Sequence, residues 1–173
     1  MSEKKTTLVL GDLTALFSAR SKNHKSINYP KLDETLKRVL GVDKYDSNSW
    51  FTLYRDDNEK QRSFVDGLRD LGWDVETYSS RDVRRLNDTR DYRFDAQIGY
   101  NIGLAVENFD RVVVVSDSYE LQPIISNLVE DDPNVEAFLV FFSDSLDGRW
   151  WKEINREDSV VNFIDLEKEL YED

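Results

Sequence analysis

Apolar runs separated by amphipathic stretches recur along the whole chain, and they predict alternating strands and helices. Six runs have the length and composition of buried strands: residues 6–11, 49–55, 73–78, 111–116, 135–142 and 160–164. Helical spacing of apolar residues follows most of them, in residues 30–40, 58–71, 95–105, 121–129 and from about residue 165. This order predicts an α/β fold, a single three-layer domain with a mostly parallel central sheet flanked by helices.

Capping residues support two of the predicted helices. Pro30 fits the first turn of one helix, and Gly41 marks its end. Asn58 can cap the next helix, which Gly72 closes. Both helices therefore have defined starts and stops in the sequence.

Two segments lack such patterns and are predicted to be loops. The segment after Asp12, which contains Arg20, Lys22 and Lys25, would lie at the same edge of the sheet as Asp12. Residues 79–92 are rich in arginine and poor in apolar side chains, which is typical of a long exposed loop.

The following helix, from Asp95, carries its apolar residues on one face: Ile98, Ile102 and Ala105.

Composition narrows the class of protein. A chain of 173 residues can bury one core and leaves no room for a second catalytic domain. It has no cysteine, which excludes disulfides, thiolate catalysis and cysteine-bound zinc, and favours a reducing compartment. No apolar run approaches the ~20 residues of a membrane span. We therefore expect a cytoplasmic protein without a membrane partner.

The net charge of -12 disfavours binding to nucleic acid, but the charge is unevenly distributed. Basic residues concentrate in residues 19–38 and 79–93, and much of the acidic excess follows Trp151. An acidic C-terminal helix can therefore coexist with basic segments that contact phosphates.

Acidic residues follow two predicted strands that we expect to be neighbours in the sheet. Asp12 ends the first apolar run, Asp117 and Glu120 follow the run at residues 111–116, and Asp95 begins the helix before that run. Side chains beyond the carboxyl ends of parallel strands converge on one crevice. Carboxylates about 4 Å apart repel by ~1 to 4 kcal/mol, so such a cluster requires protonation, solvation or a cation. Oxygen ligands of this kind favour Mg²⁺ or Mn²⁺.

Each acid also has a purely structural interpretation, which the sequence leaves open. Asp12 and Asp95 can cap helices, and the segment from Asp117 to Glu120 can cap the helix that follows it. Asp144, which follows the run at residues 135–142, can face the same crevice or serve as a turn residue.

Three segments, in order along the chain, resemble the motifs of NYN domains of the LabA-like group, within the PIN-like superfamily of metal-dependent ribonucleases. They are LVLGD ending at Asp12, RFD ending at Asp95, and VVVVSDSYELQP ending at Pro123. The resemblance aligns Asp12 and Asp95 with two family carboxylates and Arg93 with the family lysine. The departures are Ala15 in place of an asparagine, Asn101 in place of the second helix aspartate, and Asp117, Ser118 and Glu120 in place of glycine, aspartate and aspartate.

The resemblance implies metal-dependent hydrolysis of an RNA phosphodiester. It assigns catalysis to Asp12, Asp95, Asp117 and Glu120. The expected ligands of the ion are Asp12, Asp95 and Glu120, with the neutral oxygens of Asn101 and Ser118 assisting. The expected RNA contacts are Arg20, Lys22, Lys25 and Arg93. The alternative is a binding or regulatory module that kept the fold and lost turnover, with an acidic surface that engages a basic protein or mimics nucleic acid. The expected partners are RNA for the nuclease, or else another protein or a second copy of the chain.

Overall fold

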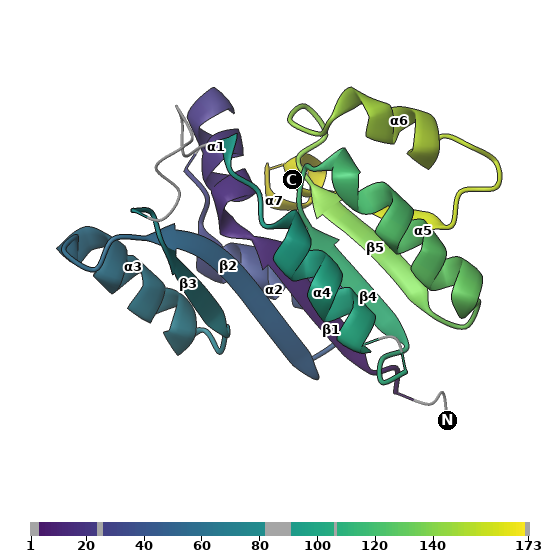
Figure 1. Cartoon of the computed structure of the whole chain (residues 1–173), viewed down its shortest axis with the longest axis horizontal. Helices are drawn as coiled ribbons and strands as arrows, with labels where there is room; N and C mark the ends of the chain where they lie inside the picture. The colour runs from purple at the N-terminus through teal and green to yellow at the C-terminus, as the bar shows by residue number, and fades with distance from the viewer. Residues whose placement is uncertain (1–3, 24–25, 82–90, 106, 172–173) are drawn as a thin grey trace.

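The computed structural model describes residues 4–23, 26–81, 91–105 and 107–171, with only the backbone described for residues 20–23. A central sheet of six strands in these residues is covered by helices on both faces (Figure 1). The strands are β1 (Thr7–Asp12), β2 (Ser47–Tyr54), β3 (Val75–Ser79), β4 (Arg111–Val115), β5 (Glu136–Phe141) and β6 (Val161–Asp165). The helices are α1 (Leu13–Asn23), α2 (Tyr29–Leu40), α3 (Glu59–Asp70), α4 (Asp95–Ala105), the 3₁₀ turn η2 (Tyr119–Leu121), α5 (Gln122–Asp131), α6 (Gly148–Ile154) and α7 (Leu166–Tyr171).

The strand order is β3-β2-β1-β4-β5-β6, and all neighbouring strands pair in parallel. The predicted α/β class is therefore confirmed. The chain builds the sheet outward from β1 in one direction and then outward from β4 in the other, so the connections reverse between these two strands. A crevice forms beyond the carboxyl ends of the strands at such a reversal, which is the usual ligand position in open α/β sheets.

Helices α4 and α5 lie in front of the sheet, and α2 and α7 lie behind it (Figure 1). Helices α1 and α3 belong to the rear layer, because their aromatic side chains pack against the same residue of α2. Phe17 and Phe64 contact the ring of Tyr29 at centroid distances of 6.4 and 5.0 Å. At the front, buried Trp150 of α6 packs edge-on against Tyr119.

Local signals placed the helix ends correctly. Gly41 closes α2 with a left-handed φ of 66°, and Pro30 lies in the first turn of that helix. Asn58 caps α3 by accepting hydrogen bonds from the N–H groups of Lys60 and Gln61. In α4, the three apolar residues predicted to face the core are all buried: Ile98, Ile102 and Ala105.

The predicted loop after Asp12 was wrong, because helix α1 begins at Leu13. Its polar residues Thr14 and Ser18 are buried along with most of its apolar ones: Leu13, Ala15, Leu16 and Ala19. A helix that is enclosed on several sides shows no amphipathic period, so the sequence pattern does not reveal it.

The sequence pattern also misses α6, a helix of seven residues. A helix this short depends on tertiary contacts. Asp147 caps its start by accepting a hydrogen bond from the N–H of Arg149, and two tryptophans hold it in place, with fully buried Trp150 packed on Tyr119 and Trp151 on Phe163. Most of the predicted arginine-rich loop, residues 82–90, lies outside the described residues.

Candidate functional site

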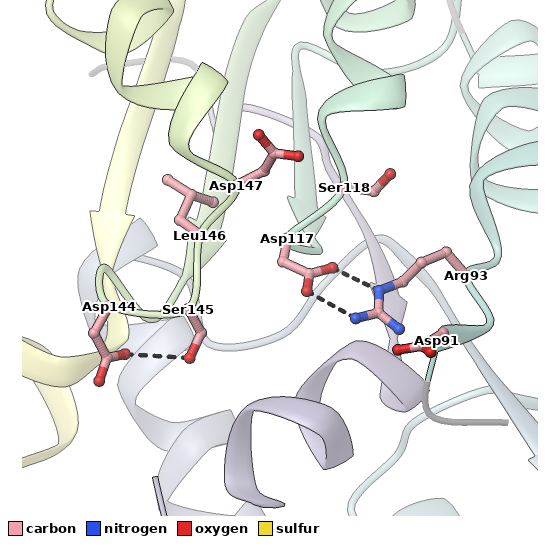
Figure 2. A pocket seen from close by; sticks show the side chains of 8 residues that line it. All are labelled: Asp91, Arg93, Asp117, Ser118, Asp144, Ser145, Leu146 and Asp147. Carbon is pink, nitrogen blue, oxygen red and sulfur yellow. Dashed lines mark hydrogen bonds and ion pairs between the residues drawn. The ribbon is translucent and has the colours of Figure 1, made fainter. Parts of the chain in front are cut away.

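An open pocket of about 420 Å³ lies where the topology predicts a ligand site, beyond the carboxyl ends of β4 and β5 (Figure 2). Its wall combines residues that precede α4 with the loops after both strands. The lining residues are Asp91, Arg93, Asp117, Ser118, Asp144, Ser145, Leu146 and Asp147. Among the described residues of this lining, four are aspartates and one is an arginine, so acidic side chains predominate.

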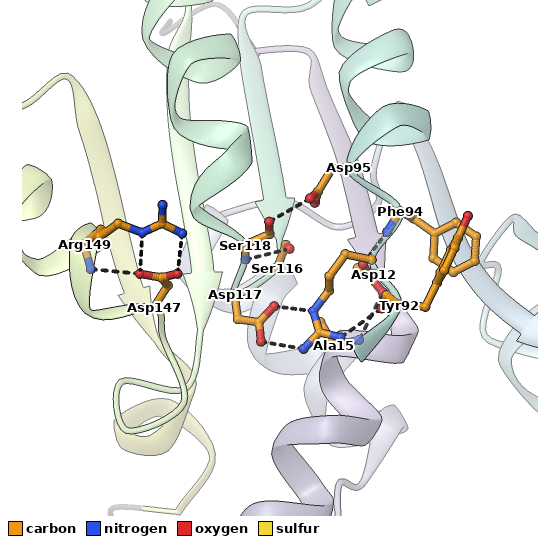
Figure 3. Close-up of polar contacts among 11 residues, drawn as sticks. Asp12, Ala15, Tyr92, Phe94, Asp95, Ser116, Asp117, Ser118, Asp147 and Arg149 are labelled. Atoms are coloured by element: carbon orange, nitrogen blue, oxygen red, sulfur yellow. Dashed lines mark hydrogen bonds and ion pairs between the residues drawn. The ribbon is translucent and has the colours of Figure 1, made fainter. Parts of the chain in front are cut away.

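Arg93 forms a two-pronged ion pair with Asp117 at the pocket wall (Figures 2 and 3). Nε lies 2.7 Å from Oδ1 and Nη2 lies 2.8 Å from Oδ2, while Nη1 donates to the carbonyl of Tyr92 at 2.9 Å. The two side chains are only 17% and 12% exposed. Burial lowers the pKa of Arg93, but Asp117, Asp12 and Asp95 more than compensate, so the guanidinium remains charged.

Asp12 is fully buried at the end of β1, and both of its carboxylate oxygens accept hydrogen bonds from backbone amides (Figure 3). Oδ1 accepts from the N–H of Ala15 at 3.0 Å, which caps the first turn of α1. Oδ2 accepts from the N–H of Phe94 at 2.8 Å. The side chain therefore joins β1 and α1 to the start of α4, as a structural clamp.

Burial raises the pKa of Asp12 from its usual 3.8 to about 7. The two backbone hydrogen bonds and the charge of Arg93 lower the pKa, but desolvation outweighs them. Folding thus favours the protonated form of this carboxyl.

Asp95 connects the start of α4 to the segment after β4. Its Oδ2 accepts a hydrogen bond from the hydroxyl of Ser118 at 2.8 Å (Figure 3). Its Oδ1 is buried and has no hydrogen-bond partner among the described residues. Burial raises the pKa of Asp95 above its ordinary value, and the Ser118 hydrogen bond opposes this shift.

Two expected ligands do not point into the crevice with the others. The side chain of Glu120 is 71% exposed and lies 3.6 Å from Arg149, which also pairs with Asp147. The amide nitrogen of Asn101 donates to the carbonyl of Gln97, one turn back in its own helix. The direction of each side chain is set by the helical turn on which it lies, η2 for Glu120 and α4 for Asn101. The sequence motif gives the spacing of the residues and not the orientation of these turns.

The expected RNA contacts are only partly described. Arg93 lines the pocket, paired as above. Arg20 and Lys22 belong to α1, with side chains outside the described ones, and Lys25 lies outside the described residues altogether.

The donor set, as placed, does not fit a magnesium or manganese site. Such a site requires several oxygen atoms directed at one ion. Asp12 is engaged by two amides and Asp117 by Arg93, which leaves the partly buried Asp95 with one oxygen that accepts no hydrogen bond among the described residues. In the part of the chain that the structure describes, no three Asp, Glu or His side chains are arranged as ligands of one ion.

Two acids of the pocket, Asp91 and Asp147, are not among the site residues predicted from the sequence. Asp147 belongs with Asp144 to the loop after β5, and it could have been found from its position, because β5 lies beside β4. Asp91 precedes α4 within the arginine-rich segment, where no local pattern distinguishes it.

The pKa of Asp12 predicts a pH dependence of stability. Because the folded-state pKa exceeds the unfolded value, the protonated native state is favoured below pH 4, and this contribution is lost as the pH rises to about 7. In the wild type, the free energy of unfolding should therefore fall by on the order of 3 kcal/mol between pH 4 and about pH 7. We expect Asp12→Asn, which cannot titrate, to lack this fall. Urea unfolding at several pH values measures it, with Asp66→Asn on the surface of α3 as the control. Parallel pH profiles for wild type and Asp12→Asn would contradict the prediction.

No protein-family model matches the sequence, and no curated protein is similar to it in sequence. Among solved structures, a crystal structure of a Vibrio parahaemolyticus protein of unknown function is similar in fold, with a TM-score of 0.74. The two chains share 16% sequence identity, and the match covers 98% of each. Similarity at this level of identity concerns the fold alone. None of the described helices has both the length and the apolar character that a membrane span requires.

Proposed function

We propose that this chain is an NYN-like domain that acts as a binding module, and that its acidic pocket accepts a cationic side chain of a basic protein segment. The observation that carries the proposal is the guanidinium of Arg93, held by two hydrogen bonds to Asp117 at the pocket wall. The crevice already accommodates one planar cation from its own chain, where a metal-dependent hydrolase would require an ion.

Acidic side chains outnumber basic ones in the described lining of the pocket, which favours cationic over anionic groups. Beyond the Arg93 pair, Asp91, Asp144 and Asp147 contribute carboxylates, and Arg149 pairs with the last of these. Phosphate groups would be repelled by this lining, whereas a lysine or arginine would gain charge-assisted hydrogen bonds. The net charge of -12 also attracts basic partners over a longer range.

The test is binding of a fluorescent lysine- and arginine-rich peptide, compared with an acidic peptide of equal length. We expect binding of the basic peptide alone, weakening with added salt. Asp91→Asn combined with Asp144→Asn should weaken it by about tenfold or more.

The matched control removes the same charge elsewhere. Asp66→Asn with Asp70→Asn changes the net charge equally on α3, away from the pocket. If both double variants weaken binding to the same extent, attraction is a property of the whole surface, and the proposed site is wrong.

The second candidate is metal-dependent ribonuclease activity, and one observation favours it. The buried Oδ1 of Asp95 has no hydrogen-bond partner among the described residues, and an unpaired buried carboxylate oxygen is costly unless a cation or proton reaches it. Single-stranded and structured RNAs incubated with Mn²⁺ test this candidate. Cleavage that Asp95→Asn and Asp12→Asn abolish, and Asp66→Asn does not, would establish hydrolysis and replace the binding proposal.

A further inference from the structure

The outer surface formed by residues 96–105 of α4 and 122–129 of α5 lacks charge in a highly charged protein, and the two exposed acids that end α5, Glu130 and Asp131, lie at the margin of this surface. Residues 96–105 and 121–129 contain no Asp, Glu, Lys or Arg, although such residues make up 34% of the chain. On α3, by contrast, exposed positions carry Arg62, Asp66 and Arg69. A helix whose outer side only meets water normally carries such charges.

Two large apolar side chains project from this surface. Tyr100 and Leu104 are 67% and 61% exposed, more than the other large hydrophobic side chains of the described residues. They are four positions apart on α4, so they lie on the same side of the helix, one turn apart. Their exposure leaves contiguous apolar area on the front of the molecule.

The two helices form one continuous face. They lie side by side in front of the sheet (Figure 1). Gly99 permits their close approach, because a Cβ at this position would lie 2.9 Å from Cδ1 of Ile124 on α5. We call the exposed outer side of residues 96–105 and 122–129 the α4/α5 face.

We infer that the α4/α5 face binds a second copy of this chain about a twofold axis. Each copy carries a net charge of -12, so two copies repel wherever their ordinary surfaces meet. Self-association is therefore least opposed at a face whose interior carries no charge, whereas a basic partner would be matched by acidic residues. Twofold symmetry lets Tyr100 of each copy pack near Leu104 of the other.

The size of the face sets the strength of the dimer. The uncharged stretches of α4 and α5 are roughly 15 and 12 Å long and pack roughly 10 Å apart, giving a flat footprint of roughly 250 to 350 Å² per copy. Stable interfaces bury about 800 Å² per partner. The dimer is therefore weak and reversible, in the range of about 10 to 100 μM. Added salt strengthens it by screening the repulsion.

Sedimentation velocity of the full chain over a concentration series tests the inference. We expect a monomer–dimer equilibrium that shifts toward dimer with salt. Leu104→Glu, on an exposed position that leaves the core intact, should weaken it by about tenfold or more. Val160→Glu, at an exposed apolar residue outside the face, should not. A monomer up to about 1 mM, or a dimer unchanged by Leu104→Glu, overturns the inference.

The absence of native cysteine permits a second, independent measurement. Under mild oxidation, Leu104→Cys and Tyr100→Cys should yield disulfide-linked dimers more rapidly than Val160→Cys at equal concentration. Equal rates for all three variants would mean random collision and would overturn the inference. Neither experiment involves the acidic pocket, so its outcome is independent of the proposed function.

Discussion

Replacing Gly11 by alanine should destabilise the fold by about 3 kcal/mol or more, because the position has no room for a side chain. Gly11 pairs with Trp50 of β2 in the sheet, and a Cβ would lie 2.0 Å from Cε3 of that ring. The ring cannot move aside, since it is fully buried and stacked on Trp73 with centroids 3.7 Å apart. Denaturant unfolding measures the loss.

Two controls identify the cause of that loss. Gly67→Ala on α3 is the same substitution where a Cβ meets nothing within 4 Å, and it should be neutral or stabilising by up to about 1 kcal/mol. In a Trp50→Leu background, Gly11→Ala should cost much less than in wild type, because the ring is gone. An equal cost in both backgrounds would show that the ring does not cause the effect.

Replacing Arg93 by methionine should cost about 3 kcal/mol at neutral pH. The change keeps an unbranched apolar stem but removes the guanidinium, which leaves Asp117 with little solvent and no cation, near Asp12 and Asp95. Because the pair is largely shielded from water, the loss should exceed that of an exposed pair. Unfolding of Arg93→Met, Asp117→Asn and the double variant measures the coupling.

The double variant provides the decisive comparison. Asp117→Asn removes the charge that Arg93→Met leaves uncompensated, so the pair of changes should cost less than the sum of the single ones. Additive costs would mean that the two side chains do not stabilise each other.

The single variant Arg93→Met also tests whether the crevice binds a metal cation. Once the guanidinium is removed, Mn²⁺ should raise the unfolding midpoint of Arg93→Met more than that of wild type, since binding to the native state stabilises it. A larger rise in wild type would instead favour a metal site that exists beside Arg93, and would strengthen the ribonuclease candidate.

Local patterns were sufficient for most of the fold. The caps at Gly41 and Asn58 act on atoms within a few residues of themselves, and their geometry follows from the residue type. The buried face of α4 follows from helical periodicity alone. Parallel pairing follows because each helix returns the chain to the same edge of the sheet.

The position of the candidate site in the sheet could be predicted from the sequence, but the hydrogen-bond and ion-pair partners of its residues could not. That Asp12 and Asp117 meet at one edge follows from strands ending in acids and lying side by side. That one oxygen of Asp12 accepts from Phe94, 82 positions away, depends on how α4 is seated over the sheet. No pattern of residue types encodes that seating.

By itself, the sequence determined the alternation of strands and helices, the parallel sheet and the edge at which its acids gather, because these depend on periodicity and on short-range backbone preferences. Only the tertiary structure decided that α1 is a helix, that Asp12 clamps two backbone amides and that Arg93 supplies the positive charge beside Asp117. Those outcomes depend on burial and on which partner comes within hydrogen-bonding distance. Both quantities are fixed only when distant segments pack together.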